Sequence, residues 1–182
     1  MDLKRHLLGR LLGCPFDGDE HSYSEAELAT VKIVNNRIYS HKVLRVNYTT
    51  YDMRRAQDSI NLCTHPDIMV LSHEDDKLDN NSEPHPYWYA RVIGIYHVEV
   101  RHDHPDALSR GVQELQFLWV QWFGQDPDYE GGWKAHRLYR VGFVADDPID
   151  PNDPTFASGA FAFIDPAEVI RGIHLILSFA YG

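Results

Sequence analysis

Two long runs of strand-forming residues near the middle of the chain constrain its fold more than any other feature. Residues 87–100 read YWYARVIGIYHVEV, and residues 115–123 read LQFLWVQWF. Apolar side chains recur at every second position in both runs, as a β-strand requires. Both faces of the first run are partly apolar, which predicts a central strand or one that bends at Gly94. The polar loop 101–111 joins the two runs, so we expect them to pair antiparallel.

Shorter runs predict further strands on both sides of this pair. Residues 31–34 and 38–48 flank Asn35-Asn36, a dipeptide that favours the tight turn of a hairpin. The other candidate strands are 67–72, 138–144, 160–164 and 169–179, the last with a bend at Gly172. Polar stretches such as 73–86 and 145–160 predict solvated loops. We therefore expect a mainly β fold, an antiparallel and partly open barrel of seven or eight strands with long polar loops.

The sequence pattern of the first thirty residues predicts helix, whereas the rest of the chain predicts strands. Leucines recur at helical spacing in residues 3–12, before Gly13, which indicates a short amphipathic helix. Its apolar stripe is expected to cap the domain, because such a stripe needs a core. Ser24 precedes Glu27 at the spacing of a capping box, which predicts one further helical turn. We therefore divide the chain into an N-terminal helix with an acidic linker, residues 1–29, and a β-rich domain, residues 30–182.

Composition narrows the class of protein. The chain has 182 residues, 43% hydrophobic and 12% aromatic, which suffices for the core of one globular domain. Two cysteines, Cys14 and Cys63, are too few for a disulfide framework. No apolar run approaches the roughly 18 residues of a membrane span, so no membrane partner is expected. Arg10 interrupts the N-terminal apolar patch and no cleavage site follows, so we expect a nuclear or cytoplasmic protein that is not secreted.

The familiar patterns of catalytic and metal sites do not occur in the sequence. Eleven histidines include His97, His102 and His104, but there is no CxxC or HExxH spacing, and a loop of surface histidines is expected. Cys63 lies two residues from His65, and sequence neighbours rarely form a nucleophile with its base. No glycine-rich phosphate loop occurs. We therefore expect a protein that is not an enzyme, with no catalytic residues, no metal and no cofactor.

Three segments in order resemble the bromo-adjacent homology (BAH) family. They are Ala90-Arg91-Val92-Ile93, Val120-Gln121-Trp122-Phe123 and Val169-Ile170-Arg171-Gly172-Ile173-His174-Leu175-Ile176. In that family two such segments form paired strands and the third closes a barrel. The resemblance therefore implies a BAH-like barrel within residues 30–182. It also implies a non-enzymatic interaction module that reads a chromatin protein or docks onto another protein partner.

A fuller resemblance extends along nearly the whole chain. The segments HLLGRLLGC, NNRIYSHKVLRVNYTTYDMRRAQDSIN, THPDIMVLSHED and FAFIDPAEVIRGIHLILSFAYG resemble an uncharacterised family abundant in mushroom-forming fungi. Its members look like C-terminal portions of large proteins, many of them similar to fungal DNA transposases, and usually continue past the position of Gly182. The resemblance implies association with a transposable element. It also implies that this chain is a truncated copy or an excised module, and it supplies no activity to carry over.

The first functional hypothesis is a BAH-like module that binds a histone tail or docks onto a protein. The acidic loops suit such a basic partner. Exposed aromatic side chains can form a cage for a methylated ammonium group through cation–π attraction. The candidate cage residues are Trp122, Trp133 and Tyr139, and the alternative is that these aromatics fill the core.

The second hypothesis is a nucleic-acid-binding accessory module of a transposase-like protein. Its candidate residues are Arg37, Lys42, Arg45, Arg54, Arg55, Lys134, Arg137 and Arg140. The formal net charge of −10 disfavours this hypothesis, whereas a clustered basic face would favour it. A third alternative is a degenerate fragment without activity.

Overall fold

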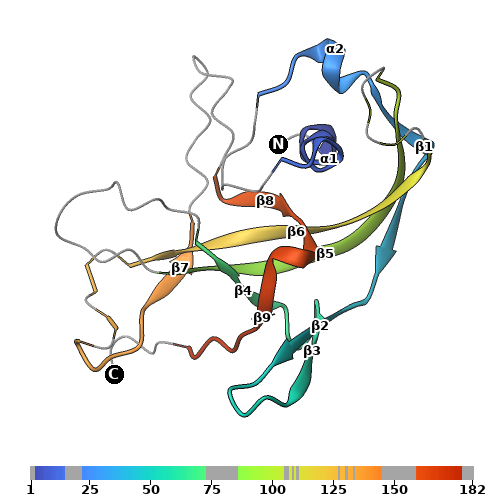
Figure 1. Cartoon of the computed structure of the whole chain (residues 1–182). Helices are drawn as coiled ribbons and strands as arrows, with labels where there is room; N and C mark the ends of the chain where they lie inside the picture. Colours follow the sequence, from blue (N-terminus) through green and yellow to red (C-terminus); the bar gives the residue numbers. More distant parts are fainter. Residues whose placement is uncertain are drawn as a thin grey trace.

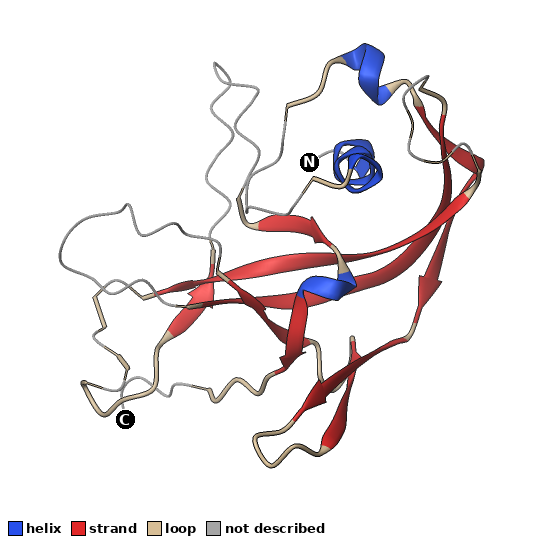
Figure 2. Ribbon diagram, in the orientation of Figure 1, coloured by secondary structure: helices blue, strands red, loops and turns tan. Residues whose placement is uncertain are grey.

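The computed structural model describes residues 3–14, 22–72, 86–104, 107, 109, 111–126, 128, 129, 131, 132, 134–144 and 159–177. These residues form a mainly β protein with a short N-terminal helix, as the sequence predicts (Figures 1 and 2). The elements are α1 (Leu3–Leu12), α2 (Glu25–Leu28), β1 (Val31–His41), β2 (Val43–Thr49), β3 (Arg55–Asn61), β4 (Asp67–Leu71), β5 (Tyr87–His102), β6 (Gln113–Gln125), β7 (Val141–Phe143), β8 (Phe161–Ile164), the 3₁₀ turn η1 (Pro166–Glu168) and β9 (Val169–Gly172). Within this part of the chain no helix is long and apolar enough to cross a membrane.

The two long runs form β5 and β6, the centre of a seven-stranded antiparallel sheet. β1 and β4 pair one after the other along the second edge of β5, and β7 and β8 do the same along β6. β9 extends the sheet beyond β4. The antiparallel pairing is confirmed, but the sheet does not close into a barrel. It stays open because its outer strands do not pair with one another, while β2 and β3 form a separate two-stranded sheet.

Two hydrophobic cores lie on opposite faces of the sheet. In β6, Leu118 and Val120 belong to the first core, whereas Leu115 and Phe117 contact the second. Because side chains alternate along a strand, these two pairs of residues face opposite sides. The first core continues into β2 and β3, and the second continues into α1, where Leu7 and its neighbours are buried.

A β-bulge in β5 explains why both of its faces are apolar. Val92 lies opposite Val120 and Gly94 lies opposite Trp119, so Ile93 is an extra residue on β5. An extra residue reverses the alternation of the residues that follow it. The even-numbered residues before the bulge therefore line the first core, and those after it line the second. They are Trp88, Ala90 and Val92 on one side, and Tyr96, Val98 and Val100 on the other.

The helical predictions are confirmed. Leu7, Leu8 and Leu11 of α1 pack into the second core, so the leucine stripe covers the sheet as expected. The predicted capping box also forms. The Ser24 hydroxyl accepts a hydrogen bond from the Glu27 backbone N–H, and the Glu27 carboxylate accepts one from the Ser24 N–H at 2.8 Å.

The hairpin predicted at Asn35-Asn36 is wrong. β1 continues through these residues, and the four residues between Ile33 and Ile38 lie opposite one residue of β5, Glu99. Asn35 and Asn36 have φ values of 54° and 51°, a left-handed conformation that asparagine tolerates better than most residues. The property that suggested a turn therefore produces a wide bulge inside one strand.

The C-terminal strand predicted at 169–179 is shorter in the structure. β9 ends at Gly172, which pairs with Ile68 near the start of β4. Because β4 begins at Asp67, the residues after β9 have no further strand to pair with. Ile173 still donates a backbone hydrogen bond of 2.9 Å to Asp67, and residues 174–177 form no strand.

Candidate nucleic-acid interface

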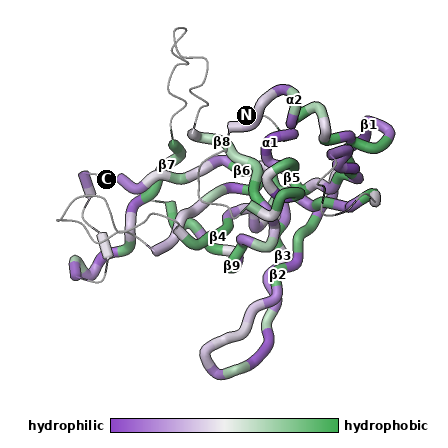
Figure 3. The backbone as a smooth tube through the Cα atoms, turned by 45° about the horizontal axis from the view of Figure 1, so that its top comes forward, coloured by the Kyte–Doolittle hydropathy of each residue, from purple (hydrophilic) through white to green (hydrophobic). Residues whose placement is uncertain are grey.

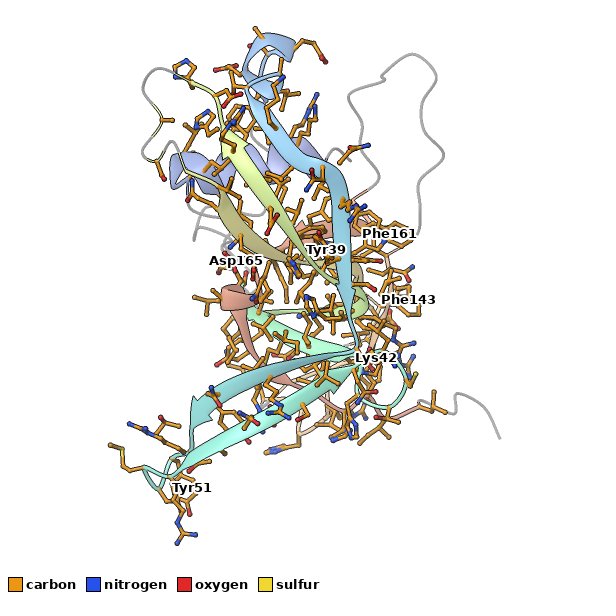
Figure 4. All side chains as sticks on the ribbon, turned by 90° about the vertical axis from the view of Figure 1, so that its right-hand side faces the viewer. Tyr39, Lys42, Tyr51, Phe143, Phe161 and Asp165 are labelled. Carbon is orange, nitrogen blue, oxygen red and sulfur yellow. The ribbon has the colours of Figure 1, made fainter. Side chains whose placement is uncertain are left out.

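β2 and β3 form a hairpin, residues 43–61, that projects from the body of the protein and is called the arm (Figures 1 and 3). All seven residues of β2 pair with β3. Lys42 lies at its root and Tyr51 at its tip (Figure 4). The tip is a closed turn, because Thr50 donates a backbone hydrogen bond of 2.8 Å to Arg54 and Met53 donates one of 2.9 Å to Thr50. The arm is therefore an ordered projection of the fold.

The inner face of the arm holds it against the body. Val46 and Ile60 are buried in the first core. Farther along, Arg171 of β9 lies over the ring of Tyr48, with 4.5 Å from Cζ to the ring centroid, and donates a hydrogen bond of 3.2 Å to its hydroxyl. Asp58 accepts a hydrogen bond of 3.0 Å from the Gly172 N–H and lies 3.6 Å from Arg171 Nε. β9 therefore braces the arm along its inner face.

The outer face of the arm is exposed and carries no acidic residue. Strand alternation places on it the exposed residues Val43, Arg45, Asn47, Thr49, Arg55, Gln57 and Ser59 and the half-buried Asn61. Asn47 lies directly opposite Gln57, whose Nε2 donates a hydrogen bond of 2.7 Å to Asn47 Oδ1. The acids of residues 43–61, all described, are elsewhere and paired: Asp52 with Arg54 at 3.1 Å, and Asp58 with Arg171 on the inner face. The outer face is therefore positive and rich in hydrogen-bonding groups.

The structure divides the predicted basic residues into two groups. Five belong to the arm and the strand that leads into it: Arg37, Lys42, Arg45, Arg54 and Arg55, all exposed. Lys134, Arg137 and Arg140 lie before β7, away from the arm in Figures 1 and 3. Arg140 is engaged in its own loop, 3.4 Å from the Asp126 carboxylate and 4.2 Å from the Tyr129 ring centroid. The eight residues therefore do not form one surface.

The structure does not bring the described cage candidates together. Trp122 lies opposite Ala90 and packs edge-on against Trp88, with ring centroids 5.9 Å apart, at the edge of the first core. Tyr89, which follows Trp88 in β5 and faces the other side of the sheet, has its pKa raised by burial first and then by the nearby Tyr139. Trp133 lies outside the described residues. The cage therefore stays a prediction.

A different aromatic site, which sequence reasoning missed, lies on that second face. Phe123 and Phe143 stack with centroids 4.5 Å apart, and the Arg91 guanidinium lies 5.6 Å and 5.2 Å from their centroids. Arg91 also makes a two-pronged ion pair with Asp67, at 2.7 Å and 3.0 Å. The chain's own guanidinium already lies where a ligand cation would bind. The pairing of strands that are distant in the sequence creates this site, so no local sequence pattern predicts it.

Among the described residues, no group of three or more His, Cys, Asp or Glu side chains is placed to hold a metal ion. The nearest approach to such a site is a histidine pair, with His41 Nε2 2.6 Å from His97 Nδ1 and Tyr39 stacked on His97 at 4.7 Å. The expected loop of surface histidines is wrong for His102, which ends β5 and is buried. It is buried because the β5 bulge turns the residues at this end toward the second core. No family model matches the chain, and no curated protein or solved structure matches it.

Proposed function

We propose that the arm binds nucleic acid through its outer face and that the chain acts as a non-enzymatic nucleic-acid-binding module. One observation carries the proposal: an ordered, projecting hairpin presents exposed arginines and neutral hydrogen-bonding side chains with no carboxylate among them. Phosphate contacts in proteins come mainly from Arg and Lys, with Ser, Thr, Asn and Gln adding hydrogen bonds. The outer face has this composition.

The distribution of charge along the chain supports the proposal despite the formal net charge of −10. Twelve of the 27 acidic residues lie in segments 17–20, 74–83 and 146–153, which contain one of the 17 Lys and Arg residues, so the remainder carries a formal charge of +1. The arm itself, residues 43–61, holds three arginines and two acids, and both acids lie off the outer face in ion pairs with Arg54 and Arg171. At physiological salt, charges beyond about 8 Å are largely screened, so a phosphate at the outer face is affected most by Arg45 and Arg55 on that face.

Binding to phosphates predicts a measurable salt dependence. Each phosphate that the arm neutralises releases counterions. The plot of log affinity against log salt concentration therefore becomes steeper by roughly 0.9 for each phosphate contact. Arg45 and Arg55 are the outer-face residues that are always charged. Lys42 at the root can add a further contact. Two to four phosphate contacts give weak, salt-sensitive binding of the kind expected of an accessory module.

The histone-tail hypothesis has less support from the described residues. It needs Trp122 and Tyr139 on one side of the sheet, and the aromatic pair on the second face already holds Arg91. The nucleic-acid hypothesis also agrees with the resemblance to transposase-like proteins, which act on DNA. Association with a mobile element and a nuclear location remain predictions from that resemblance.

The proposal is tested by fluorescence anisotropy with a labelled DNA duplex of two helical turns, about 21 bp. We compare the wild type with two variants that each remove two positive charges, Arg45→Gln/Arg55→Gln in the arm and Lys134→Gln/Arg137→Gln in the loop before β7. All four side chains are exposed, so both variants should fold. We expect the arm variant to reduce the salt slope by roughly 2 and the loop variant to leave it unchanged.

Two results would overturn the proposal. One is equal slopes for the arm variant and the wild type, because phosphate contacts would then not come from the outer face. The other is the absence of measurable binding by the folded wild type at about 50 mM salt, where non-specific binders are readily detected. Circular dichroism and urea unfolding establish that each variant is folded.

A further inference from the structure

The shape of the arm and the side chains of its outer face indicate which kind of nucleic acid it binds. Resting on the proposed function, we infer that the arm's ligand is B-form duplex DNA, and that the outer face enters the major groove with Asn47 and Gln57 against the base edges.

The first argument is shape. The arm is a two-stranded ribbon, seven residues long in each strand, that pairs with no other strand and packs on the body only through its inner face. The major groove of B-form DNA, roughly 12 Å wide and 8.5 Å deep, admits a two-stranded β-ribbon. In Figures 1 and 4 the ribbon stands away from the sheet, so its outer face can approach a groove. The outer face is exposed from the Arg45–Ser59 pair to the tip.

The second argument is the chemistry at the centre of the face. Asn47 and Gln57 form one cross-strand pair, joined by a hydrogen bond of 2.7 Å between their amides. This bond uses one Gln57 N–H and part of the capacity of Asn47 Oδ1. Both Asn47 Nδ2 hydrogens and Gln57 Oε1 keep their full hydrogen-bonding capacity. Adenine offers an acceptor, N7, and a donor, N6, side by side in the major groove, and amide side chains are the usual partners for this pattern.

The third argument is the placement of the arginines around that pair. On the root side, the next pair on the outer face is Arg45 with Ser59. On the tip side, the next pair is Arg55 with Thr49. The two arginines are on different strands of the ribbon and about 14 Å apart along it, at about 3.4 Å per residue. Because the two arginines are on opposite strands, a ribbon that lies along the groove holds one toward each wall, where the guanidiniums can reach phosphates while the amides face the bases.

Other nucleic acids fit the arm less well. The major groove of an RNA duplex is too deep and narrow for side chains to read its bases. Surfaces that bind single strands stack the bases on aromatic side chains, and the outer face has no aromatic residue. Tyr51 is the aromatic residue of the tip and lies beyond the paired strands. The chemistry of the face therefore favours duplex DNA.

The inference is tested by selection from duplex DNA with a randomised centre, followed by sequencing. We expect the wild type to enrich a short motif containing A·T pairs, because one lost bidentate contact costs roughly tenfold in affinity. The Asn47→Ala/Gln57→Ala variant should enrich no motif, while its binding to the unselected pool keeps the wild-type salt slope because Arg45 and Arg55 are unchanged. Thr49→Ala/Ser59→Ala is the matched control, since it also truncates one polar side chain on each strand of the same face.

Replacement of adenine and guanine by their 7-deaza analogues in the enriched duplex tests the groove. These analogues remove the N7 acceptor from the major groove and leave the phosphates and the minor groove unchanged, so we expect at least fivefold weaker binding. Equal affinity for the 7-deaza duplex, absence of any enriched motif, or tighter binding to single-stranded DNA or an RNA duplex would overturn the inference. In each of these cases, binding that still depends on Arg45 and Arg55 would leave the proposed function standing.

Discussion

A histidine in α1 makes the stability of the protein sensitive to mild acid. His6 packs against the Phe117 and Phe163 rings, with centroids 6.5 Å and 6.1 Å away, and its Nε2 makes no hydrogen bond to the described residues. Burial, and then the nearby positive charge of Arg10, lower the pKa of His6 from 6.5 to about 4. The folded protein therefore favours the neutral imidazole.

The sign and size of the effect follow from proton linkage. The unfolded chain binds a proton at His6 below about pH 6.5, whereas the folded chain does so only near pH 4. The free energy of unfolding therefore falls as the pH drops from 6.5 to 4 and does not change through this group above 6.5. A difference of about 2.5 pKa units corresponds to about 3 kcal/mol in all, of which about 2.5 kcal/mol is lost by pH 4.5.

Urea unfolding, followed by tryptophan fluorescence between pH 7.5 and 4.5, measures this loss. We compare the wild type with His6→Leu, which places an apolar side chain at this position and removes the titrating group. Carboxylates titrate in both proteins, so the difference between the two curves isolates His6. We expect the wild type to lose about 2.5 kcal/mol more than the variant over this range. Parallel curves would refute the reasoning, and the exposed His174→Leu controls for removal of a histidine.

Three further predictions concern the fold. Deletion of Ile93 removes the bulge and turns the following apolar positions of β5 to the wrong core, where each misplaced valine costs about 1.5–3 kcal/mol, so near-UV circular dichroism should show loss of the native fold. Phe117→Ala should lower the free energy of unfolding by about 3–5 kcal/mol in urea, whereas Tyr51→Ala at the exposed tip should change it by about 0.5 kcal/mol or less. Arg171→Ala removes the contacts with Tyr48 and Asp58, so amide hydrogen exchange in the arm should become roughly tenfold faster while β5 and β6 keep their protection.

Each of these three predictions has a result that contradicts it. If the Ile93 deletion unfolded cooperatively, with a free energy of unfolding within about 1 kcal/mol of the wild type, the bulge would not determine which core the β5 side chains face. Equal effects of the Phe117 and Tyr51 substitutions would contradict the assignment of core and tip. Unchanged exchange in the arm of Arg171→Ala would show that β9 does not brace it.

The strongest parts of the sequence-based prediction rest on periodicity and on local hydrogen bonding. β5 and β6 were predictable because their apolar residues alternate over long stretches, and the α2 capping box because Ser24 and Glu27 recognise each other within one turn. The continuous apolar character of the even positions in β5 was visible too. The sequence did not show that the facing of the β5 side chains reverses at Ile93, because the bulge is defined only by the pairing of β5 with β6.

The arm was the largest omission. Residues 55–61 read RAQDSIN, with only Ala56 and Ile60 apolar, so the strand β3 left no clear signal. Its tip contains neither glycine nor asparagine, and Met53 takes the left-handed conformation at φ 64° that such residues usually provide. The basic residues of the arm were found from composition, but Asn47 and Gln57 were not, since they meet only when β2 and β3 pair.

The central claim, that the outer face of the arm is the nucleic-acid-binding surface, is tested most directly by nuclear magnetic resonance. A two-turn DNA duplex is titrated into the ¹⁵N-labelled chain, and the backbone amide shifts are mapped onto the sequence. We predict progressive shifts in β2 and β3, strongest around Asn47, Arg55 and Gln57, with little change in the loop before β7 or in α1. Shifts confined to residues 134–144 or to the second face of the sheet, with the arm unchanged, would contradict the claim.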